Sequence, residues 1–243
     1  MTATTTAAPR TTPEPVTPAT AAAWSQLLSA AADECLAVLR TAADRDWSHP
    51  AQGLEWTCRG TLDHLALGLV GYTGLLVARP QDRYITLFAS LDAQAPVPAC
   101  LEGIGIASSL LASTVRDTAA EVRAWHPWGH SDAGGFAAMG ITELVVHTYD
   151  ITRAFGLSWA PPHGPSGAVL ARLFPDAPTG NGPSDTLLWA TGRCVLPGHP
   201  RRTEWQWHGT PVGDGEATPE SGPPESGPPE SGPPETAPAD RPR

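Results

Sequence analysis

Four long stretches of this chain space their large apolar residues three and four positions apart, which places those residues on one face of an α-helix. The predicted helices cover residues 20–44, 57–78, 99–124 and the stretch from Ser131-Asp132 to Gly156. No convincing alternation of apolar and polar residues, the mark of a strand, lies between them. Four such helices can bury their apolar faces against one another, so the sequence predicts an all-α fold, a four-helix bundle.

The part of the chain after the bundle is shorter and less regular. Helical patches occur near residues 165–174 and 183–193, and the stretch 204–207, Glu-Trp-Gln-Trp, is a candidate strand. We therefore expect a bundle domain over residues 20–160, followed by a short α(+β) extension over residues 161–212.

Both ends of the chain lack the large apolar residues that a core needs. Residues 1–19 are mainly Thr, Ala and Pro, and residues 213–243 are mainly Pro, Gly, Glu and Ser. The tail repeats Glu-Ser-Gly-Pro-Pro at positions 220, 225 and 230, a period too short for a solenoid. Such composition predicts disorder at both ends. The tail is either an acidic, solubilising appendage or a docking motif.

Charge and composition exclude several classes of function. The net charge is −10, and all 15 basic residues are arginines that form no cluster, so a nucleic-acid partner is not expected. The absence of lysine excludes Schiff-base chemistry and a P-loop. The N-terminus has no apolar leader, and no window of 18 residues is apolar and uncharged. We expect a cytoplasmic protein without a membrane partner.

Three ionisable residues share the apolar face of the fourth predicted helix. At 100° per residue, Glu143, His147 and Asp150 all fall within the stripe that contains Phe136 and Met139. A carboxylate in such a place is usually hydrogen-bonded, paired or bound to a metal. The pattern is therefore compatible with two alternatives, a metal site and a buried Glu–His hydrogen bond.

The second predicted helix offers a third ligand. Gly68 and Gly71 lie along the same face as His64, and they leave space that either a ligand channel or a closely packed helix would use. We treat both glycines as candidate pocket residues. Together, His64, Glu143 and His147 would form a set of two imidazoles and one carboxylate. Three protein ligands with a fourth position open are typical of a catalytic metal site.

Three segments of the chain resemble a known family. Residues 56–65 read WTCRGTLDHL, residues 143–156 read ELVVHTYDITRAFG, and residues 184–193 read SDTLLWATGR. They are similar to segments of the mycothiol-dependent maleylpyruvate isomerase family, which is part of the DinB-like superfamily. The similarity covers about residues 22–210.

The resemblance implies a DinB-like four-helix bundle that binds a divalent metal, usually zinc, through His64, Glu143 and His147. It also implies a low-molecular-weight thiol, mycothiol, as cosubstrate. A metal-activated thiolate is a nucleophile, so the implied activity is that of an S-transferase or a cis–trans isomerase on a small electrophile. Asp150 would bind His147 or His64 from behind and hold that imidazole in orientation; the alternative is a salt bridge with the N-terminal helix.

The chain also departs from the family. The isomerase branch has a fuller α/β C-terminal domain, whereas only about 50 residues lie between Gly156 and the acidic tail here. Maleylpyruvate itself is therefore not implied as the substrate. Arg193, a candidate pocket residue, would be either an anion-binding arginine or a charge at a helix C-terminus. His126, Trp128 and His130 would either line the pocket mouth or be ordinary loop residues.

Two functions thus remain open from the sequence. The first is the metal-dependent enzyme that uses mycothiol. The second is a non-catalytic module on the same bundle, which would sense a metal or a thiol, or dock a partner through the Pro-rich tail.

Overall fold

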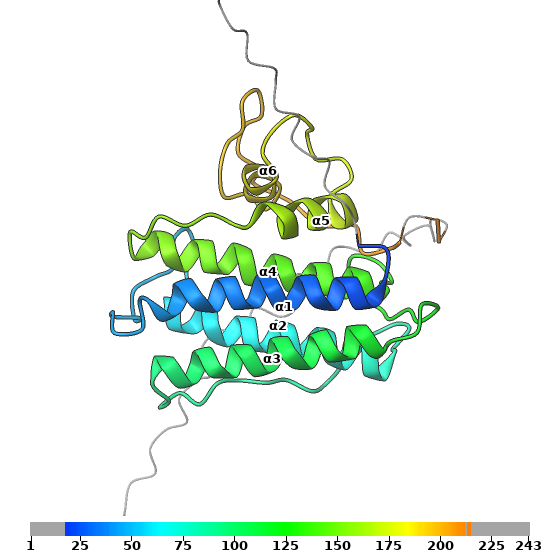
Figure 1. The fold of residues 1–243 in the computed structure, drawn as a ribbon, viewed down its shortest axis with the longest axis horizontal. Coiled ribbons are helices and arrows are strands. Elements are labelled where there is room, and N and C mark those ends of the chain that lie inside the picture. The colour runs from blue at the N-terminus through cyan, green and yellow to red at the C-terminus, as the bar shows by residue number, and fades with distance from the viewer. Residues whose placement is uncertain (1–17, 212, 215–243) are drawn as a thin grey trace, which may run out of the picture. The chain divides into compact units, whose positions relative to one another are not determined.

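Four helices of the chain lie side by side and two shorter ones follow (Figure 1). The structure is a computed structural model that describes residues 18–211, 213 and 214, and in this part the chain has six helices and no strand. The helices are α1 (Ala21–Arg40), α2 (Cys58–Ala78), α3 (Val97–Asp117), α4 (Ala133–Ala154), α5 (His163–Leu173) and α6 (Pro183–Ala190). Helices α1 and α2 each pack against both α3 and α4. The predicted all-α bundle is confirmed.

Local sequence signals set the ends of the two helices that carry the ionisable residues. The Thr57 hydroxyl accepts a hydrogen bond from the Gly60 amide at 2.9 Å and begins α2. The Asp132 carboxylate accepts one from the Gly135 amide at 2.7 Å and begins α4. Gly156, with φ +66°, follows the end of α4 in the left-handed conformation that glycine adopts easily. These predicted helix ends are confirmed.

Helix α4 is the most deeply buried of the four. Gly140 lies where α4 meets its three neighbours, because a Cβ atom at this position would contact leucines of all three. That atom would lie 2.7 Å from Leu111 of α3, 3.4 Å from Leu69 of α2 and 3.6 Å from Leu28 of α1. Those three leucines are fully buried. The absence of a side chain at Gly140 therefore lets the helices approach closely at the centre of the core.

Three sequence-based expectations about the fold were wrong. Helix α1 ends at Arg40, not at 44. Helix α3 ends at Asp117, not at 124, because Thr118 takes an extended conformation and its hydroxyl donates to the Thr114 carbonyl at 2.6 Å. Val122 is buried from the turn that follows, which explains why the apolar spacing continues. Among the residues that the structure describes, the candidate strand at 204–207 has no partner strand; the next residues bond instead to the end of α5 and to the loop before α4.

The extension after the bundle packs on α4. Helix α5 contacts both α4 and α6 (Figure 1). Arg172 of α5 binds the N-cap carboxylate of α4, with its Nη2 atom 2.9 Å from Asp132 Oδ1. The ends predicted to be disordered, residues 1–19 and 213–243, lie outside the described residues except for 18, 19, 213 and 214.

Helices α2 and α3 are each long and apolar enough to cross a membrane when judged by length and composition alone. One face of each helix packs in the bundle, with Leu62, Leu65 and Leu69 of α2 and Leu101, Ile104 and Leu111 of α3 buried, whereas Val77 of α2 and Ile106 and Leu110 of α3 are exposed. The core therefore accounts for a large part of their apolar character.

Candidate metal centre

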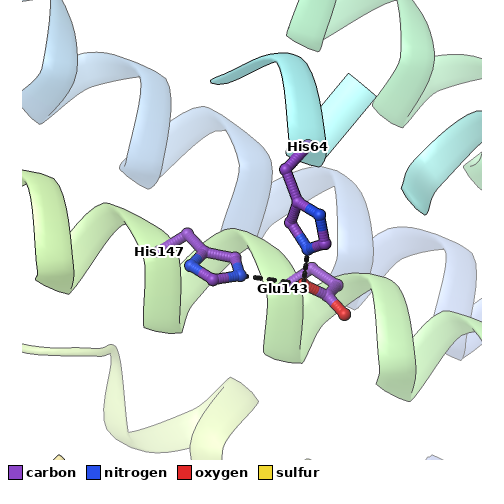
Figure 2. A group of neighbouring side chains, drawn as sticks. All are labelled: His64, Glu143 and His147. Carbon is purple, nitrogen blue, oxygen red and sulfur yellow. Dashed lines mark ion pairs between the residues drawn. The ribbon is translucent and has the colours of Figure 1, made fainter. Parts of the chain in front are cut away.

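The three ligand candidates meet between α2 and α4. Glu143 and His147 lie one turn apart on α4, and His64 extends from α2 toward the same carboxylate (Figure 2). Both imidazole rings approach Glu143 Oε2, with His147 Nε2 at 3.1 Å and His64 Nε2 at 3.4 Å. One ligand atom from each of the three residues lies within 4.8 Å of the others. In the described part of the chain, these three residues are the group of His, Cys, Asp and Glu side chains whose ligand atoms lie close enough to share one metal ion.

The donor set and its spacing fit a small divalent metal. Two imidazoles and one carboxylate are ligands that zinc uses in catalytic sites, at bond lengths of about 2.0–2.2 Å. In a tetrahedron with such bonds the ligand atoms lie roughly 3.3–3.6 Å apart, close to the contacts of 3.1 and 3.4 Å with Glu143 Oε2. The side chains are only slightly exposed, 23% for His64, 14% for Glu143 and 9% for His147. Direct Glu–His hydrogen bonds would give similar distances, so both alternatives from the sequence fit this spacing.

Glu143 is held as a carboxylate by its surroundings. Burial opposes its ionisation, but hydrogen bonds from His147 and His64 outweigh burial and hold the pKa of Glu143 well below its usual range. Its second oxygen, Oε1, accepts a hydrogen bond from the Tyr72 hydroxyl at 3.1 Å. Burial, followed by the negative charge of Glu143, raises the pKa of Tyr72, so the phenol keeps its proton. The carboxylate thus has one oxygen toward the imidazoles and one fixed by a phenol.

Asp150 contacts the far side of the His147 ring. Its Oδ2 atom lies 3.2 Å from His147 Nδ1, and its side chain is 1% exposed. Burial opposes the charge on His147, yet the hydrogen bonds with Asp150 and Glu143 raise its pKa above the usual value. With Nδ1 donating to Asp150, the lone pair of a neutral His147 is on Nε2, the atom that faces Glu143 and His64. A metal ligand would need that tautomer.

Arg193 has a role that neither sequence-based alternative described fully. It reaches Asp150 with two groups, Nη2 to Oδ2 at 2.9 Å and Nε to Oδ1 at 3.3 Å. Its Nη1 atom also donates to the carbonyl of Thr191, the C-cap of α6, as expected for a charge at a helix C-terminus. The alternative considered for Asp150, a salt bridge with the N-terminal helix, does not match the structure, because its arginine partner comes from the segment after α6.

The space beside the two glycines of α2 is used differently at each position. A Cβ atom at Gly71 would lie 2.6 Å from the hydroxyl of Tyr84, which belongs to the connection between α2 and α3. At Gly68 the nearest atom is Glu143 Cγ, at 3.9 Å. Gly68 therefore borders the ligand cluster, whereas a loop residue fills the space at Gly71, in place of the expected channel or helix. Burial and the charge of Glu143 raise the pKa of Tyr84 to about 12.

Trp56 is a neighbour of the site that no spacing or periodicity of the sequence indicates. Its ring stacks on His64, with centroids 4.4 Å apart, and lies 6.3 Å from the ring of His147. Tyr72 of α2, whose hydroxyl donates to Glu143, is a second neighbour of the site that the sequence patterns do not indicate. It lies eight residues after His64, about 80° round the helix, so helical spacing alone does not place it on the face of His64.

The three loop residues before α4 have other partners. The ring of His126 is buried, and its Nδ1 atom accepts a hydrogen bond from the backbone N–H of Trp128 at 3.2 Å. The Trp128 ring packs against Trp207, and His130 Nε2 lies 2.7 Å from the carbonyl oxygen of Gln81. These are packing and loop contacts, and none of them includes a residue of the ligand cluster.

Comparison with known proteins identifies a family for most of the bundle. Residues 28–152, more than half of the chain, match the family described as mycothiol maleylpyruvate isomerase N-terminal domain. The matched segment contains His64, Glu143, His147 and Asp150, whereas Arg193 lies beyond its end. Searches of curated proteins and of solved structures gave no match.

Proposed function

We propose that this chain, which belongs to the mycothiol maleylpyruvate isomerase N-terminal domain family, is a metal-dependent enzyme that uses mycothiol as its nucleophile. The reaction would be S-transfer to a small electrophile, or cis–trans isomerisation of one. The observation that carries the proposal is the convergence of His64, Glu143 and His147 at the interface of α2 and α4.

The residues of the site fit a divalent cation, and zinc suits the donor set best. His64, Glu143 and His147 would hold it, and when bound it would stabilise a coordinating thiol as the thiolate. The protein's own groups prepare the ligands. Tyr72 fixes the outer oxygen of Glu143, and Asp150 orients the ring of His147.

Further features support a small-molecule role. All four cysteines are free, as in a reducing compartment such as the cytoplasm, which we propose as the location. Trp56 provides an apolar wall beside His64 where part of a thiol or an electrophile would lie. Small molecules therefore suit the site as partners.

A non-catalytic module that senses a metal or thiol is the second candidate. It is favoured by the extent of the family match, which covers an N-terminal domain and ends at residue 152. Turnover distinguishes the two functions, because a sensor would bind the thiol without accelerating its transfer.

The test is to load the purified full chain with zinc, measure the metal content, and incubate the protein with mycothiol and a bimane electrophile. We expect about one zinc ion per chain and faster conjugation than in solution. His64→Ala and His147→Ala should lose both properties. The matched control is His49→Ala, which removes an exposed histidine outside the cluster.

Chelation gives a reading that does not depend on activity. A ligand present at 100 times its Kd stabilises the folded state by about 2.7 kcal/mol, so removing zinc should lower the Tm of the wild type and leave that of His147→Ala unchanged. A protein that binds no metal would refute the proposal. A protein that binds zinc but conjugates no faster than His64→Ala would be a sensor.

A further inference from the structure

Two arginines of the extension bind carboxylates of α4, one near each end of that helix. Arg172 pairs with Asp132 at the start of α4, and Arg193 pairs with Asp150 one turn before its end. The Asp132 pair lies away from the ligand cluster, whereas Asp150 touches His147 directly. The two pairs thus have similar chemistry, but only one of them contacts a ligand candidate.

We propose that Arg193 is a positioning residue of the metal centre: it holds Asp150 against His147, so that metal affinity depends on the segment after α6. This inference rests on the proposed function, because it concerns the affinity of the same site. It adds a residue that lies 43 positions from Asp150 and outside the matched family segment.

The geometry supports this role. An imidazole that binds a metal through one nitrogen commonly donates its other N–H to a carboxylate, which fixes the ring orientation. Asp150 Oδ2 serves His147 Nδ1 and Arg193 Nη2 at the same time, and Oδ1 is bound by Arg193 Nε. The guanidinium fork therefore restrains rotation of the carboxylate. With Asp150 1% and Arg193 14% exposed, little water is present to replace the arginine.

Positioning and simple Coulomb repulsion predict opposite effects. A guanidinium near a cation site disfavours a second cation, so loss of Arg193 would tighten metal binding if charge alone mattered. If Arg193 acts by holding Asp150, its loss must weaken metal binding. The sign of the change in affinity therefore decides between the two.

The experiment measures the Zn²⁺ affinity of the full chain by chelator competition at fixed neutral pH. We expect Asp150→Asn to weaken binding by about 10–100-fold, and Arg193→Gln by about tenfold. Arg193→Lys should recover part of the loss, because an ammonium keeps the charge but lacks the fork. If Arg193→Gln does not fold, Arg193→Lys decides, with about threefold weaker binding expected.

Two further variants serve as controls. Arg172→Gln removes the other arginine that ties the extension to α4. Arg201→Gln removes another positive charge of the extension. The Nε atom of Arg201 donates to the carbonyl of Gly192, next to Arg193 in the chain, and this hydrogen bond does not involve Asp150. Both should change zinc affinity by less than about twofold, and thermal unfolding of the metal-free variants reports their effect on folding.

A double variant tests whether Arg193 acts through Asp150. Asp150→Asn with Arg193→Gln should bind zinc no more weakly than Asp150→Asn alone, because the two changes interrupt one chain of contacts. The absorption spectrum of the Co²⁺ form should change in Arg193→Gln and not in Arg172→Gln. Additive losses, or affinity that is unchanged or tighter in Arg193→Gln, would overturn the inference while leaving the proposed function intact. A wild type without zinc would overturn both.

Discussion

The Tyr72 hydroxyl lies 3.1 Å from Glu143 Oε1, while both imidazoles of the ligand cluster approach the other oxygen, Oε2. Glu143 is therefore bound on both of its oxygens by the protein's own side chains. Because donors bind both oxygens, few side-chain rotamers of Glu143 can satisfy all of these hydrogen bonds. The phenol thus orients the ligand from the side opposite the histidines.

Removing the Tyr72 hydroxyl should be costly for this reason. We expect Tyr72→Phe to lower the free energy of unfolding by about 1–3 kcal/mol, because a hydrogen bond to a buried charge is lost while the ring remains. Urea denaturation of the metal-free protein measures the change. Tyr149→Phe removes a partly exposed phenol from α4 and is the control, with little effect expected. Equal stability of the two variants would show that the bond to Glu143 contributes nothing.

His126 should make stability depend on pH. Burial lowers the pKa of His126 from the ordinary 6.5 to about 4, and the negative charge of Glu143 partly opposes this shift. Between these values the unfolded chain binds more protons, so the contribution of His126 is complete above pH 6.5 and is lost as the pH falls toward 4. The full loss is about 3 kcal/mol, of which about 2 kcal/mol falls between pH 7 and 5.

A comparison of two proteins isolates this effect from the other titrating groups. His126→Asn keeps an acceptor for the Trp128 amide but has no proton to gain. Chemical unfolding at several pH values should show that the wild type loses stability more steeply than His126→Asn below pH 6.5. Parallel curves would mean that His126 takes up its proton as readily in the folded protein as in the unfolded chain.

Gly140→Ala should destabilise the bundle by about 1–3 kcal/mol, since an added methyl group would overpack a core that is already full. Its Cβ atom would lie 2.7 Å from Leu111 Cδ2, and that leucine is fully buried and has no room to move. Gly164→Ala in α5 is the control, because nothing lies within 4 Å of its Cβ position. The control should gain at most about 1 kcal/mol, and thermal or urea unfolding would measure both. A neutral Gly140→Ala would show that the four helices can separate slightly without loss.

The features that local sequence predicts well are those set by local physics. The starts of α2 and α4 follow from Thr57 and Asp132, whose side chains satisfy amides only three positions away. The shared face of Glu143 and His147 follows from the helical repeat alone. Pairing with His64 required only that two apolar helices pack face to face.

The features that the sequence did not predict depend on contacts between distant segments. Tyr84 fills the space at Gly71 from a connection without apolar periodicity, so no pattern gives its position. Arg193 and Asp150 are 43 residues apart, and no local pattern indicates which of the chain's carboxylates an arginine after a short helix will bind. The end of α3 was misplaced because Val122 continues the apolar spacing beyond the last helical turn.

The two arginine–aspartate pairs of α4 also bear on where this protein can be divided. The family match ends at residue 152, yet Arg172 and Arg193, the partners of Asp132 and Asp150, both lie after it. A fragment cut at that boundary would keep every ligand candidate but lose the guanidinium that holds Asp150 against His147, and it would uncover the part of α4 on which α5 packs. The segment that the family match covers is therefore shorter than the segment that would have to be transferred to another protein for the site to keep its structure.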